Sequence, residues 1–277
     1  MAAVRPSCTE RTTSSNSDCG RVFIGVRTAS ALHPKGAFPR LIMSPIASNL
    51  QEVRGRIQAA QSARAQRAFP SGAQPVALVA VSKTQPPEAI RAAFAAGQRA
   101  FGENYVQEAL AKQAALADLP LEWHFIGPIQ SNKARSIASH FDWVHGVERM
   151  KVAELLARAR APAVPLNVCV QVNVSGEASK AGVAPADAGA LALAVAALPG
   201  LRLRGLMTII ENTADPLAQR AQFRMLRELA ERIRGQGVAL DTLSMGMSQD
   251  YETAIGEGAN LVRIGSAIFG ARARAPA

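Results

Sequence analysis

The sequence has few aromatic residues and no long hydrophobic run. Aromatic residues make up 5% of the 277 residues, whereas 48% are hydrophobic, so Ala, Val, Leu and Ile must fill most of the core. No apolar run reaches the roughly 18 residues that a membrane-spanning helix needs, which argues against a membrane protein. The length fits one barrel-type domain or two small domains.

Cysteine is scarce as well. The three cysteines are Cys8, Cys19 and Cys169, and they form neither a CxxC pair nor a metal-ligand spacing. We therefore predict no metal site. Cys169 lies within an apolar run, so we expect it in the core. This usage fits a reducing compartment, and we predict a cytoplasmic location.

The basic residues are almost all arginines. The chain carries a net charge of +10, from 31 Lys and Arg against 21 Asp and Glu. Such a charge can indicate nucleic-acid binding. However, the arginines are scattered along predicted helices, and no basic cluster is flanked by aromatic residues. We therefore predict no nucleic-acid surface.

Residues 1–42 differ from the rest of the chain. They are rich in Ser, Thr, Arg and Pro, contain only Glu10 and Asp18 as acids, and lack hydrophobic periodicity. The composition resembles an organelle transit peptide, but we favour Met43 as the start, because a capped helical pattern follows it directly. In either case we expect this segment to be disordered, and the folded domain to span 43–277.

Beyond Met43 the pattern is a helix followed by regular alternation of strands and helices. Apolar spacing predicts a first helix from a cap at Ser48 or Asn49 to about Phe69. Eight strands are then predicted, most of them followed by helical segments such as Pro216 to Gly235. The predicted strands are Val76–Ser82, Arg99–Gly102, Glu122–Ile126, Phe141–His145, Leu166–Val174, Leu203–Ile209, Thr242–Met245 and Leu261–Ile264. This order predicts an α/β fold, a single (β/α)8 TIM-type barrel. The alternative is an open doubly wound sheet, but no GxGxxG turn follows the first strand.

Active sites of such barrels lie where the strands end at their carboxyl termini. Lys83 follows the first strand and is one of only six lysines. Partial burial there would lower the pKa of its amine, and a neutral amine can attack an aldehyde to form an imine. The alternative is an ordinary solvated lysine.

Two glycine- and serine-containing turns follow the seventh and eighth strands. The first is the SMGMS segment that begins at Ser244, and the second is the RIGS segment with Gly265 and Ser266. Exposed backbone N–H groups in such turns can bind phosphate. Alternatively, the glycines only allow tight turns.

Arg263 lies in the eighth strand, where strand alternation can direct it into the barrel mouth. A buried permanent cation needs an acceptor. That acceptor could be a pyridine nitrogen, which the arginine would keep unprotonated, or a carboxylate such as Glu252 or Glu257.

Taken together, six segments resemble one family. They are VALVAVSKTQP, FGENYVQE, WHFIGPIQSNK, VNVSGEASKAGV, GLMTI and LSMGMSQDYETAIGEGANLVRIGSAIFG, in collinear order between Met43 and Gly270. This set resembles the pyridoxal 5′-phosphate (PLP) homeostasis proteins, whose fold is similar to the N-terminal barrel of alanine racemase.

The resemblance implies a PLP site and a role for each matching residue. Lys83 corresponds to the Schiff-base lysine and Asn104 to the residue beside the cofactor ring. Ser244, Gly265 and Ser266 resemble the phosphate site, and Arg263 resembles the partner of the pyridine nitrogen. Met207 and His124 resemble pocket-wall residues.

The resemblance also implies a monomeric carrier of PLP for apo-enzymes, without established catalytic activity. The alternatives are a PLP-dependent amino-acid racemase and a cofactor-free Schiff-base aldolase. A racemase of this fold takes a catalytic tyrosine from a second domain, and only seven residues follow Gly270, so we expect no such domain. Tyr105 is the one tyrosine at a strand exit, and we expect it to pack rather than act as a base.

Overall fold

The computed structural model describes residues 44–65, 74–160, 164–177, 180–211 and 213–270. All of them belong to one compact unit, which spans Ile42–Ala277. The expectations for residues 1–42 lie outside the described residues.

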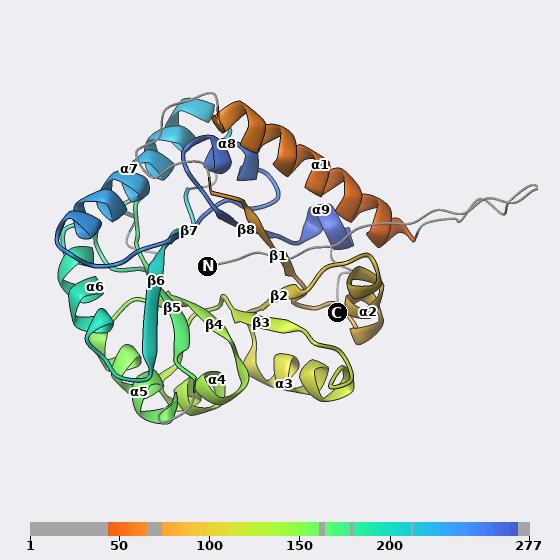
Figure 1. Ribbon diagram of the computed structural model, residues 1–277, viewed down its shortest axis with the longest axis horizontal. Coiled ribbons are helices and arrows are strands. Elements are labelled where there is room, and N and C mark those ends of the chain that lie inside the picture. Colours follow the sequence, from red (N-terminus) through yellow and green to blue (C-terminus); the bar gives the residue numbers. More distant parts are fainter. Residues whose placement is uncertain (1–43, 66–73, 161–163, 178–179, 212, 271–277) are drawn as a thin grey trace, which may run out of the picture. The chain divides into compact units, whose positions relative to one another are not determined.

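The strands form a closed parallel barrel in the order β1 to β8, each paired with the next and β8 paired with β1 (Figure 1). Their bounds are β1 Ala77–Val81, β2 Ala100–Glu103, β3 Glu122–Phe125, β4 Trp143–Val147, β5 Leu166–Gln171, β6 Leu201–Met207, β7 Thr242–Ser244 and β8 Leu261–Ile264. The predicted TIM-type barrel is therefore confirmed, and the open sheet is excluded.

Helices surround the barrel and bury their apolar faces on it (Figure 1). They are α1 Pro45–Ala65, α2 Pro87–Ala95, α3 Val106–Ala115, α4 Ala134–His140, α5 Met150–Arg160, α6 Ala188–Ala196, α7 Pro216–Gly235, α8 Tyr251–Gly256 and α9 Ser266–Phe269. Among these described helices, none is both long enough and apolar enough to cross a bilayer.

The first helix begins earlier than the apolar spacing predicts. Ser44, not Ser48 or Asn49, caps it, because the Ser44 hydroxyl accepts a hydrogen bond from the Ala47 N–H. Pro45 occupies the first helical position, where a missing N–H costs nothing. The predicted cap was therefore wrong, and the Ser-Pro pair was the better signal.

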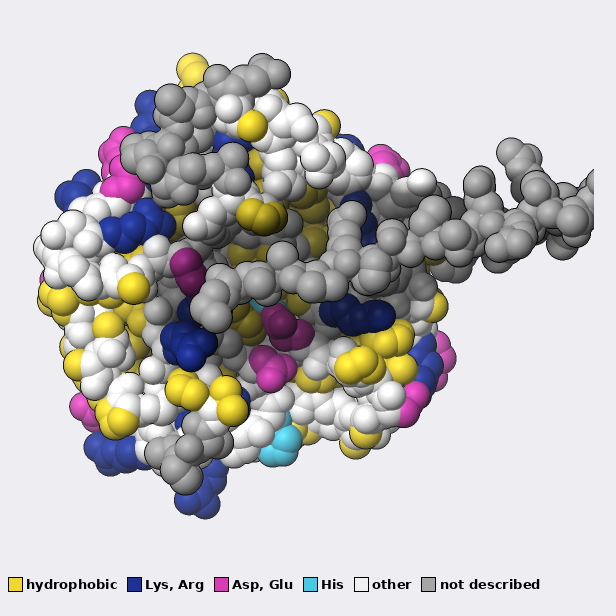
Figure 2. Space-filling view, viewed as in Figure 1, with side chains coloured by type: hydrophobic (Ala, Val, Ile, Leu, Met, Phe, Trp, Pro, Cys, Tyr) yellow, Lys and Arg dark blue, Asp and Glu magenta, His cyan; other side chains and the backbone are white. Residues whose placement is uncertain are grey.

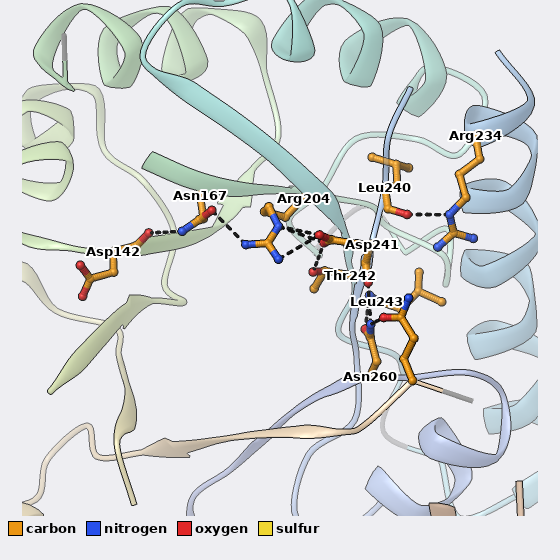
Figure 3. Close-up of polar contacts among 10 residues, drawn as sticks. Asp142, Asn167, Arg204, Arg234, Leu240, Asp241, Thr242, Leu243 and Asn260 are labelled. Atoms are coloured by element: carbon orange, nitrogen blue, oxygen red, sulfur yellow. Dashed lines mark hydrogen bonds and ion pairs between the residues drawn. The ribbon is translucent and has the colours of Figure 1, made fainter. Parts of the chain in front are cut away.

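A polar network joins neighbouring strands at the amino-terminal end of the barrel (Figure 3). The guanidinium of Arg204 donates to both carboxylate oxygens of Asp241, at 3.0 and 2.9 Å, and to Asn167 Oδ1 at 3.1 Å. Arg204 also lies over the ring of Trp143, 4.6 Å from its centroid. These contacts link β4, β5, β6 and the start of β7.

Candidate functional site

A cavity of about 520 Å³ opens at the carboxyl ends of the strands, a size typical of small-ligand sites. Residues within β8 or after β1, β2, β3, β5, β6, β7 and β8 line it. They include Lys83, Gln85, Asn104, Ile126, Ile209, Ile210, Glu211, Met247, Ser248, Gln249, Asp250, Arg263, Gly265 and Ser266. Five of the seven predicted cofactor-binding residues are therefore brought together, namely Lys83, Asn104, Arg263, Gly265 and Ser266.

Lys83 is half-buried and lines the cavity just after β1. The residues on either side of it are fixed. The Ser82 hydroxyl donates to Glu103 Oε1 at 2.7 Å, and the Thr84 N–H donates to Glu108 Oε1 at 2.5 Å. Thr84 has a φ of 64°, which a β-branched residue rarely adopts. The position of the lysine is therefore held by contacts outside the cavity.

A buried lysine connects these contacts. Lys112 Nζ on α3 donates to the Ser82 carbonyl, to Glu103 Oε1 and to Glu108 Oε1, at 2.7, 2.8 and 2.6 Å. The side chain of Glu103 is fully buried, and burial raises the pKa of its carboxyl despite the nearby ammonium group. We call Lys112, Glu103 and Glu108 the lysine-loop clamp.

The turn between β8 and α9 forms another wall of the cavity. The Ser248 hydroxyl accepts from the N–H groups of Gly265 and Ala267, at 3.3 and 3.4 Å. A Cβ at Gly265 would lie 3.2 Å from the Val81 carbonyl oxygen, so glycine permits the close approach of this turn to β1. The N–H groups of Gly265 and Ala267 thus lie beside the Ser248 hydroxyl, and Ser248, Gly265 and Ser266 all line the same cavity.

Arg263 reaches the cavity from β8, although the residue is only 3% exposed. Its guanidinium donates to Ser244 Oγ at 2.7 Å and to the Thr208 carbonyl at 2.8 Å. Burial lowers its pKa to about 10, an effect that Asp250 opposes, so it remains a cation at neutral pH.

The carboxylates considered as partners of Arg263 are paired elsewhere. Glu252 binds Arg56, and Glu257 lies 3.5 Å from Arg224. Among the described residues, Arg263 forms no ion pair with a carboxylate. It is therefore a buried cation at the edge of a ligand cavity, with only neutral acceptors.

Asn104 follows β2 and has an unsatisfied acceptor. Its Oδ1 atom is buried and has no hydrogen-bond partner among the described residues. Buried polar atoms are nearly always paired, so an orphan in a cavity wall points to a missing ligand.

Ser244 and Met207 do not line the cavity. Both are fully buried at the ends of β7 and β6, where Ser244 contacts Arg263 and Met207 packs with Trp143 and Cys169. His124 is also buried, in contact with His145. These side chains lie in the barrel interior, out of contact with the cavity.

Ser248 is one of the cavity residues that the predicted site lacks. It lies four positions after Ser244 in the same SMGMS segment, so both serines were candidates. The end of the strand distinguishes the two serines. Ser244 is the last residue of β7 and stays inside the barrel, whereas Ser248 lies in the loop that follows.

Fold and site together define a barrel of the alanine racemase N-terminal class. The profile of the family "Alanine racemase, N-terminal domain" matches residues 46–273. An alanine racemase from Corynebacterium glutamicum shares the fold, with a TM-score of 0.61 at 19% identity over 83% of this chain and 61% of that one.

Within that class, other relatives are much nearer. The pyridoxal phosphate homeostasis protein of Pseudomonas aeruginosa is 60% identical over 233 residues, which cover 83% of this chain and 97% of that one. PipY of Synechococcus elongatus, whose structure has PLP bound, is 41% identical with a TM-score of 0.71 over 81% of this chain and all of PipY. The chain belongs to the family of pyridoxal phosphate homeostasis proteins, and the predicted resemblance is confirmed.

Proposed function

We propose that this protein binds PLP at the cavity, attached through Lys83 as a Schiff base, and takes part in PLP homeostasis as a cytoplasmic carrier. The observation that carries the proposal is that Lys83 and the β8–α9 turn line the same cavity. An amine and an anion site are the two groups that recognise an aldehyde bearing a phosphate. The near relative PipY, with PLP bound, supports this assignment.

The other cavity residues fit the same ligand. We assign Gly265, Ser266 and Ser248 to the phosphate, Asn104 to the ring face and Arg263 to the ring nitrogen. When bound, PLP supplies an electron-withdrawing ring. Arg263 is always a donor, so it would hold the ring nitrogen unprotonated and weaken that effect. Ser244 and Met207 would support the cavity residues from the barrel interior, without contact with the phosphate.

A carrier role is favoured over a racemase because the two tyrosines and His124, the acid–base candidates considered from the sequence, do not line the cavity. Tyr105 is 58% exposed and does not line the cavity. Tyr251 is buried beneath Gly246, and His124 lies in the barrel interior. We propose that the protein acts as a monomer and delivers PLP to apo-enzymes that depend on it.

We therefore expect no appreciable turnover of amino acids. The purified protein, loaded with PLP, should show α-proton exchange in deuterated water far slower than about 1 per second, the low end of ordinary enzymatic rates. The same preparation should transfer PLP to an apo-enzyme. Exchange at enzymatic rates would instead support the racemase alternative.

The phosphate assignment predicts a ligand-dependent loss of affinity. Ser248→Ala and Ser266→Ala should each weaken PLP by roughly 10- to 100-fold, since a hydrogen bond to a charged group contributes about 1.5–3 kcal/mol. Pyridoxal, which lacks the phosphate, is the matched control and should bind both variants nearly as well as wild type. Equal losses for the two ligands, measured by absorption titration, would move the phosphate elsewhere.

A further inference from the structure

A continuous chain of hydrogen bonds runs through the barrel interior from the cavity to the opposite end. Arg263 donates to Ser244 Oγ at 2.7 Å, and Ser244 Oγ lies 2.8 Å from His145 Nδ1. His145 Nε2 lies 3.0 Å from His124 Nδ1, and His124 Nε2 lies 2.6 Å from Glu122 Oε1. We call Ser244, His145, His124 and Glu122 the polar chain.

The two ends of the polar chain have different environments. Ser244, His145 and His124 are almost completely buried, whereas half of the Glu122 side chain is exposed. Glu122 begins β3, at the amino-terminal end of the barrel. Figure 2 looks onto this end and shows acidic side chains near the barrel axis. Asp142 and Asp241, which precede β4 and β7, are exposed there too. Protons can therefore reach the far end of the polar chain directly from water.

While both rings are neutral, the Glu122 carboxylate sets the direction of the donors in the polar chain, because a carboxylate only accepts. Ser244 Oγ accepts from Arg263 with one lone pair and, in this state, donates its own proton to His145 Nδ1. A neutral His145 then carries its proton on Nε2 and donates to His124 Nδ1. His124 likewise donates from Nε2 to the Glu122 carboxylate. Each hydrogen bond thus fixes the tautomer of the next ring.

The charges around the two rings favour this arrangement. Burial, His124 and Arg263 hold the pKa of His145 well below its usual value, so that ring is neutral at pH 7. The hydrogen bond from His124 lowers the pKa of Glu122, which keeps it a carboxylate.

Two other titratable groups of the described barrel interior, Cys169 and Arg204, do not compete for the proton. Burial raises the pKa of the Cys169 thiol on β5 to about 12. Arg204 on β6 is bound to Asp241 and lies over Trp143, whose ring stacks on His124 with centroids 5.5 Å apart.

We propose that the polar chain positions Arg263 for the cofactor ring and transmits a change of protonation from the amino-terminal end of the barrel to the cavity. This inference rests on the proposed function, because it takes Arg263 to face the ring nitrogen of bound PLP. A proton added to His124 would occupy Nδ1, the atom that accepts from His145. His145 must then carry its proton on Nδ1, and Ser244 Oγ must accept from both His145 and Arg263.

The first test needs no cofactor. Imidazole ¹⁵N resonances of the full chain without PLP should show both rings protonated on Nε2 at pH 8. On acidification, the protonated nitrogens of both rings should change at one common pH midpoint. Glu122→Gln removes the carboxylate that stabilises a charged His124, and the midpoint should fall by about one pH unit, a tenfold weaker proton affinity. A proton on His145 Nδ1 at pH 8, or a midpoint that does not move, would overturn the proposal.

The second test measures PLP affinity against pH by visible absorption. Wild type should lose affinity at the midpoint seen by NMR, and Glu122→Gln should follow the shifted midpoint. Glu154→Gln, which alters an exposed ion pair with Arg158 on α5, is the matched control and should change neither measurement. An affinity profile that is the same in Glu122→Gln and wild type refutes the link to the cavity.

Ser244→Ala separates positioning from phosphate binding. It should weaken PLP and pyridoxal by the same factor, roughly tenfold, because Arg263 acts at the ring. A loss confined to PLP would place Ser244 at the phosphate and contradict the proposal. If wild type shows no PLP band at any pH, the proposed function fails, whereas the NMR measurement still decides whether the polar chain exists.

Discussion

Lys83→Ala is expected to abolish the covalent attachment of PLP altogether. The variant should show no visible absorption band when titrated with PLP, and borohydride should trap no adduct on it. The physical reason is that Lys83 lines the same cavity as the β8–α9 turn, where the aldehyde of a ligand held by its phosphate would meet the amine. The rest of the cavity is unchanged by the substitution, so weak non-covalent binding of PLP should remain, detectable by equilibrium dialysis against the variant.

The control variants are Lys180→Ala, which changes another lysine of the cavity wall, and Lys133→Ala, which lies in the loop after β3. Both should keep the band. Peptide mapping that finds the reduced pyridoxyl group on either of these lysines would disprove the assignment to Lys83. A purified protein that never becomes coloured with PLP would favour the Schiff-base aldolase instead.

Much of the barrel follows from local sequence. The bounds of α7, Pro216–Gly235, and of β8, Leu261–Ile264, agree with the prediction to the residue. Asp215 accepts from the Leu217 N–H and Pro216 follows, so the start of α7 is encoded locally. The predicted fourth strand began at Phe141, but β4 begins at Trp143. Phe141, the residue directly after α4, packs edge-on against Phe125 of β3, so its apolar character reflects tertiary packing.

The cavity wall was also predictable, because strand ends of a parallel barrel meet at one edge. Lys83 and Gly265 needed only this rule. The polar chain could not be predicted from a local pattern, because His145 and Ser244 are 99 residues apart in the sequence. Their side chains meet only because β4 and β7 both direct them into the barrel interior. His124 was predicted as a pocket-wall residue and His145 was given no role. Only the distances between their ring atoms reveal the connection to Arg263.

Lys112→Met is expected to cause the largest loss of stability, about 3–5 kcal/mol of unfolding free energy, since it leaves a buried carboxylate without its cation. Glu103 is fully buried within the lysine-loop clamp, and its Oε2 atom already has no hydrogen-bond partner. Arg91→Met is the matched control. It removes an ion pair with Asp118 that is exposed on both sides, so the unfolding free energy should stay near that of wild type.

The pH dependence of Lys112→Met identifies the cause of its loss. Burial raises the pKa of Glu103, and removing the ammonium raises it further, so the folded variant binds a proton more tightly than the unfolded chain does. Its unfolding free energy, relative to wild type, should therefore recover as the pH falls from 8 toward 5. Adding Glu103→Gln should recover stability at neutral pH without this pH dependence. Denaturant unfolding at several pH values measures both effects. A deficit that stays constant with pH, or that Glu103→Gln does not reduce, would mean that the loss comes from packing of the Lys112 stem.

In the Lys112→Met variant the segment that carries Lys83 also loses its contact at the Ser82 carbonyl. We therefore expect the visible band to form more slowly with PLP, even at pH values where the fold is retained.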